Sequence, residues 1–117
     1  MEEEQRVNKR VPIAATARIS CRSNEGSKSI ESTVASISFL GIGLYADYVP
    51  TRDTAVSVEI TFIATDGQLR TDAIKGNIVN ATEVVGLRYL CVVFKEKVNR
   101  RDQPHLYEHL HSIIDQD

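Results

Sequence analysis

The chain has 117 residues, a net charge of −2, 42% hydrophobic residues and 26% charged residues, which fits one globular domain with a single core. It has no apolar run near the roughly 20 residues that a membrane span requires, and its acidic start, Met1–Glu4, lacks the apolar region of a secretory signal. We therefore expect a cytoplasmic protein without membrane insertion. The negative net charge also argues against a nucleic acid polymer as partner.

The N-terminal residues 1–11 are polar, charged and without apolar periodicity. We expect a flexible arm here, followed by a single domain over residues 12–117. The arm carries three cations, Arg6, Lys9 and Arg10, directly after three glutamates. Such a cluster suits a small anionic ligand, because a long polyanion usually requires a broad basic face.

Strand patterns dominate the chain after Pro12. Alternation of apolar and polar residues predicts half-buried strands. It is clearest in residues 55–64, where the residues expected to point inward are Val56, Val58, Ile60 and Phe62. The six predicted strands cover residues 13–21, 29–36, 42–48, 55–64, 69–80 and 87–95, with Asp66 and Gly67 in a hairpin turn and Gly76 at a bulge or barrel bend.

The pattern changes after Phe94. Leu106, Leu110 and Ile113 recur at helical spacing, which predicts a C-terminal α-helix over about residues 103–115 with Asp102 as its N-cap. Six antiparallel strands joined by short turns would leave exposed edges unless the sheet closes. We therefore predict a mainly β fold, a six-stranded antiparallel β-barrel with the helix on its surface or across one end.

The corner between the second and third predicted strands holds the candidate chemistry. Ser36 and Ser38 offer hydroxyls that donate and accept hydrogen bonds, and Gly41 and Gly43 permit positive φ or close approach of a ligand to bare backbone. An ordinary turn also favours small residues. The corner becomes informative through the arginine pair upstream in the arm.

The remaining reactive side chains favour structural roles. Cys21 and Cys91 lie in predicted strands without CxxC spacing, which is typical of small buried apolar residues. His105 and His109 have the spacing of a two-histidine metal face, but they lack an HExxH pattern, so we interpret them as polar-face residues and expect no metal site. No nucleophile–base pair is visible, so we expect no enzyme activity.

The arm and the corner resemble the two signatures of the PilZ domain family, the bacterial receptor module for cyclic di-GMP. Residues 6–10 read Arg-Val-Asn-Lys-Arg and match RxxxR. Residues 36–41 read Ser-Ile-Ser-Phe-Leu-Gly and match (D/N)xSxxG, except that Ser36 stands where the family has Asp or Asn. The resemblance covers essentially the whole chain, with Cys91 at a position where the family more usually has glycine.

The resemblance implies a PilZ-like β-barrel that binds cyclic di-GMP, with no further cofactor. The arginines would clamp phosphates and guanine edges, and the corner would face the ligand from the other side. Ligand binding would order the arm, and a protein partner that the sequence does not identify would read this change in the control of motility, biofilm or exopolysaccharide. The ligand-binding residues implied are Arg6, Lys9, Arg10, Ser36, Ser38 and Gly41.

Serine at position 36 supports an alternative, a degenerate PilZ-like protein-interaction module that does not bind the nucleotide. Loss of one buried polar contact costs about 1 kcal/mol, against a binding free energy of roughly −8 to −12 kcal/mol, which favours weaker binding over none. A third hypothesis, a barrel for single-stranded nucleic acid, requires exposed aromatic residues among basic ones; with 6% aromatic residues it ranks last. We expect a monomer or weak dimer.

Overall fold

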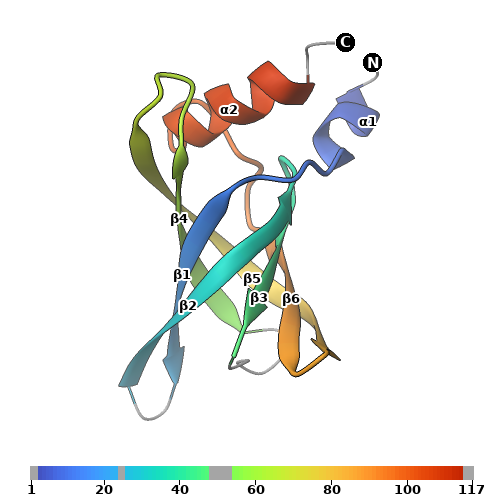
Figure 1. Cartoon of the computed structure of the whole chain (residues 1–117), viewed down its shortest axis with the longest axis vertical. Coiled ribbons are helices and arrows are strands. Elements are labelled where there is room, and N and C mark those ends of the chain that lie inside the picture. The colour runs from blue at the N-terminus through green and yellow to red at the C-terminus, as the bar shows by residue number, and fades with distance from the viewer. Residues whose placement is uncertain (1–2, 24–25, 48–53, 115–117) are drawn as a thin grey trace.

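In the part of the chain that the structure describes, two helices and six strands follow one another (Figure 1). This computed structural model describes residues 3–23, 26–47 and 54–114. The elements are α1 (Glu3–Asn8), β1 (Ala15–Ser23), β2 (Gly26–Ile37), β3 (Gly41–Ala46), β4 (Ala55–Ile63), β5 (Leu69–Val84), β6 (Leu87–Phe94) and α2 (Pro104–Ile114).

The strands close into an antiparallel barrel in the order β1-β2-β3-β6-β5-β4, and β4 pairs with β1 to complete it. The prediction of a mainly β fold with a closed six-stranded barrel and a C-terminal helix is confirmed. Closure pairs the strand edges that an open sheet would leave exposed. It also places β3 between β2 and β6, with Gly41 opposite Val93, and this neighbourhood holds the candidate site.

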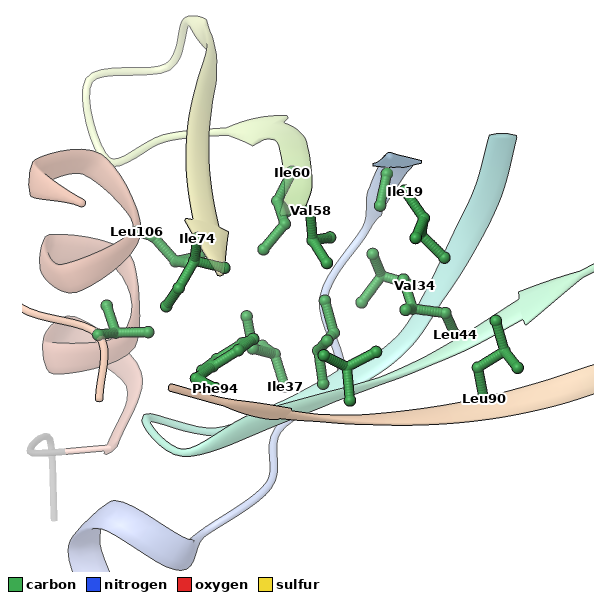
Figure 2. Packing of buried hydrophobic residues seen from close by; sticks show 14 of the residues in the cluster. Ile19, Val34, Ile37, Leu44, Val58, Ile60, Ile74, Leu90, Phe94 and Leu106 are labelled. Carbon is green, nitrogen blue, oxygen red and sulfur yellow. The ribbon is translucent and has the colours of Figure 1, made fainter. Parts of the chain in front are cut away.

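The core combines inward-facing residues of all six strands with the buried face of α2 and a few residues of the connecting segments. In β4 the alternation follows the prediction, with Val56, Val58, Ile60 and Phe62 buried. Figure 2 shows such side chains from the strands, together with Leu106 of α2, pointing into one interior. Because burying a large apolar side chain stabilises a fold by about 1.5–3 kcal/mol, this interior fixes the barrel and its corners.

Helix α2 lies across one end of the barrel, the end where α1 also lies (Figure 1). Its buried stripe is Leu106, Leu110 and Ile114. The prediction of Asp102 as N-cap is wrong: the helix begins at Pro104, and the N–H of Leu106 donates to the buried carboxylate of Asp72 in β5 (2.7 Å). A side chain distant in sequence thus accepts a hydrogen bond from an N–H group in the first turn of the helix, where such groups have no partner within the helix.

The described part of the arm, residues 3–11, contacts the barrel, while its flexibility stays a prediction. Glu3–Asn8 form α1, whose Val7 packs against the core. Val11 is buried, and it exchanges two backbone hydrogen bonds of 2.9 Å with Ile37 at the end of β2. Val7 and Val11, two apolar residues among polar and charged ones, account for this attachment.

Several element boundaries also differ from the predictions. Strands β2 and β5 are longer than expected, whereas Tyr48 and Pro50–Asp53 lie outside the described residues. The hairpin at Asp66 and Gly67 is confirmed. The bulge of β5 lies between Ile78 and Asn80 and not at Gly76. Neither described helix has the length and apolar character needed to span a membrane.

Candidate functional site

Ser38 builds the corner between β2 and β3. Its hydroxyl oxygen accepts hydrogen bonds from the backbone N–H groups of Leu40 (3.1 Å) and Gly41 (3.2 Å), and its own N–H donates to the carbonyl of Gly41 (2.9 Å). Only 3% of Ser38 is exposed. In the structure this hydroxyl and the nearby backbone N–H groups bond to one another inside the turn, and their contact with a ligand stays a prediction.

Two glycines of β3 are required by close packing and not by backbone conformation. Neither Gly41 nor Gly43 uses the positive φ that glycine permits. A Cβ atom on Gly41 would lie 2.7 Å from the carbonyl oxygen of Val92, and one on Gly43 would overlap the phenol oxygen of Tyr89. These glycines let β6 and the Tyr89 ring approach β3 closely.

Arg10 lies over this corner. The bridge between Val11 and Ile37 brings the end of the arm alongside β2, and the Arg10 Nη1 donates to the hydroxyl of Ser36 at 3.4 Å. Its Nη2 lies 3.7 Å from the position of a Cβ on Gly41. Arg10 is exposed and Ser36 half-buried. The structure thus places Arg10, the second arginine of RxxxR, beside Ser36 and Gly41. These two residues are the first and last of the segment that resembles (D/N)xSxxG.

Arg6 meets the same corner at a different residue. Its guanidinium carbon lies 4.7 Å from the centroid of the Phe39 ring, a cation–π contact. Phe39 is buried and meets Tyr107 of α2 edge to face, with centroids 5.8 Å apart. Lys9, between the arginines in sequence, is half-buried, and its N–H donates to the Arg6 carbonyl (3.4 Å).

Three glutamates directly precede Arg6 in the sequence, and we predict that they pair with Arg6 and Arg10 in the absence of ligand. Glu2 and the side chains of Glu3 and Glu4 lie outside the described part of the structure, so this pairing stays a prediction.

A groove of about 380 Å³ adjoins the Arg6 side of the corner. Its walls include Lys97 and Arg100, from the segment between β6 and α2, and Tyr107. Sequence reasoning missed these residues. The available signal was the cluster of Lys97, Arg100 and Arg101 just before the helix.

Of the two histidines with metal-face spacing, His105 and His109, the second contacts an aromatic ring. The His109 ring packs edge to face against Phe62 with centroids 5.3 Å apart, and burial lowers the pKa of His109 below its ordinary value. Among the residues described, no three His, Cys, Asp or Glu side chains gather where a metal ion could be held. Cys21 is buried and Cys91 half-buried, and both are free thiols.

Comparison of the chain with models of known protein families found no match, and comparison with curated proteins found none either.

Proposed function

We propose that this protein is a cyclic di-GMP receptor or adaptor domain without enzyme activity. The observation that carries the proposal is the position of Arg10 beside Ser36 and Gly41. Ser36 follows Arg10 by 26 positions in the sequence, with all of β1 between them. The two segments that resemble PilZ signatures are thereby parts of one surface.

The chemistry of this surface suits a doubly phosphorylated guanine ligand. An arginine fork matches N7 and O6 of guanine, and it binds phosphate oxygens in the same bidentate manner. The Arg10–Ser36 hydrogen bond is long and exposed, so exchanging it for a ligand contact costs little. The Ser36 hydroxyl then remains as a donor or acceptor for the same ligand.

The arm supplies a route from binding to signalling. Because Val7 and Val11 already hold the arm against the barrel, ligand binding would fix the cationic side chains between and beside them, Arg6, Lys9 and Arg10. A cytoplasmic protein partner would recognise the α1 surface in this fixed state. By resemblance, the output is control of motility, biofilm or exopolysaccharide.

Calorimetric titration of cyclic di-GMP into the parent protein tests the proposal, with two variants beside it. Arg10→Ala removes the arginine at the corner, and Arg18→Ala removes an exposed arginine of β1 that pairs with Glu31 (2.9 Å) and serves as a control of equal charge. Hydrogen bonds to a charged group contribute about 1.5–3 kcal/mol, so Arg10→Ala should weaken binding by at least about tenfold. Arg18→Ala should bind as the parent does.

A folded parent that releases no heat with cyclic di-GMP would contradict the proposal. That result would support the alternative, a PilZ-like protein-interaction module that has lost its ligand, for which Ser36 in place of Asp or Asn is the supporting residue.

A further inference from the structure

The groove beside the corner concentrates positive charge around aromatic rings. It is lined by Arg6, Phe39, Lys97, Asn99, Arg100 and Tyr107. Three of these residues are cations, and no carboxylate lines the groove among the described residues. Its volume of about 380 Å³ is at the lower end of the roughly 300–1,000 Å³ typical of small-molecule sites, which suits one nucleotide unit.

Contacts between the corner and the C-terminal part of the chain hold the groove in shape. The N–H of Val98 donates to the carbonyl of Phe39 (2.9 Å), which ties the segment after β6 to the corner. The Phe39 ring then meets Tyr107 edge to face. These contacts join the first arginine of the arm to α2 through a rigid aromatic pair.

An arginine guanidinium lies over each ring of this pair. Arg6 lies over Phe39 at 4.7 Å, and Arg100 lies over Tyr107 at 5.0 Å. A guanidinium stacked on a ring still directs its N–H groups outward in its own plane, where a phosphate can bind them. Arg100 also approaches Glu108 at 3.9 Å, but both side chains are more than half exposed, and an exposed ion pair of this kind contributes little.

We propose that this groove binds one guanylate unit of cyclic di-GMP, with Arg100 and Lys97 contacting its phosphate, while Arg10 and Ser36 bind the other unit. This proposal rests on the proposed function. Phe39 and Gly41 are two residues apart, so their Cα atoms are separated by at most about 7 Å, and the two halves of one cyclic dinucleotide can reach both clusters. The phosphate of one unit then faces Lys97 and Arg100, and the phosphate of the other unit faces Arg10.

Neighbouring arginines provide a matched test. Arg100→Ala removes a groove cation, whereas Arg101→Ala removes an 85% exposed cation beside Asp102 that does not line the groove. Calorimetry with cyclic di-GMP should show binding at least about tenfold weaker for Arg100→Ala and changed by less than about twofold for Arg101→Ala. Both variants alter exposed side chains, and circular dichroism checks that they fold.

A second readout uses the unsubstituted protein. In ¹H–¹⁵N spectra, cyclic di-GMP should shift the arginine Nε–H signals of Arg6, Arg10 and Arg100 and leave that of Arg101 unchanged. Equal weakening of binding by Arg100→Ala and Arg101→Ala would overturn the proposal that the groove binds the ligand, since the weakening would then come from a general loss of positive charge. Parent-like binding by Arg100→Ala, with weakened binding by Arg10→Ala, would overturn the groove but leave the proposed function standing. Absence of binding by the folded parent would overturn both.

Discussion

The two serines of the corner have different roles, and replacing Ser38 by alanine tests this difference. Ser38 builds the turn, whereas Ser36 faces outward. The Ser38 hydroxyl accepts the N–H groups of Leu40 and Gly41, of which the second is buried. A buried N–H left without a partner costs about 1–3 kcal/mol, while water can reach the partly buried Leu40 N–H. We therefore expect Ser38→Ala to lower the free energy of unfolding by about 2 kcal/mol.

Ser36→Ala is the matched control, because it removes only a long, exposed hydrogen bond to Arg10. Its effect on unfolding should be within about 0.5 kcal/mol. Urea unfolding followed by circular dichroism measures both variants. With a slope of about 1–3 kcal/mol per molar urea, Ser38→Ala should shift the midpoint by roughly 1 M. Equal midpoints for the two variants would refute the structural role given to Ser38.

Three further predictions concern the elements around the site. Asp72→Ala should lower the free energy of unfolding by about 1–3 kcal/mol in thermal melts, because the Leu106 N–H loses its acceptor. Asp72→Asn keeps an acceptor and should lower it by less than about 1 kcal/mol. Equal losses for the two variants would contradict the role of Asp72 as the cap of α2. Gly43→Ala should destabilise the parent by about 1–3 kcal/mol but cost less in a Tyr89→Ala background, because the overlap with that ring disappears; equal costs in both backgrounds would contradict the contact. Burial lowers the pKa of His109 from its ordinary 6.5, so the unfolded chain takes up the proton first and stability falls as the pH drops through about 6.5. His109→Gln should therefore reduce the change of melting temperature with pH between about pH 7.5 and 5.5. An unchanged pH dependence would contradict the lowered pKa of His109.

The barrel could be predicted from the sequence because the alternation of apolar and polar residues that indicates a strand is local and recurs along the chain. Alternation in β4 identified the inward residues Val56, Val58, Ile60 and Phe62, and closure followed from the need to pair strand edges. The start of α2 could not be predicted in this way. Its N–H acceptor is Asp72, 34 residues before Leu106, whereas the sequence beside the helix offered only Asp102.

The arm shows a different limit of sequence reasoning. Its composition indicates an unattached segment, and the attachment depends on just two residues, Val7 and Val11. Neither makes a periodic pattern long enough to predict an element. Their partners lie in the barrel core and at Ile37, which only the folded structure brings to them.

For the candidate site, the sequence predicted which segments meet but not how their side chains are directed. Arg10 and Ser36 come together as expected. The orientation of Ser38 was not predictable, because a serine hydroxyl serves a turn or a ligand equally well. Lys97 and Arg100 were missed because their segment reaches the corner through the hydrogen bond between Val98 and Phe39, which joins segments far apart in sequence.

The central claim is that the arm and the corner bind the same molecule of cyclic di-GMP. Intermolecular nuclear Overhauser effects in the complex measure this most directly. We predict contacts from the ligand both to the side-chain protons of Arg10 and to the backbone protons of Gly41. A bound ligand with contacts to only one of these two residues, or unchanged spectra at saturating nucleotide, would contradict the claim.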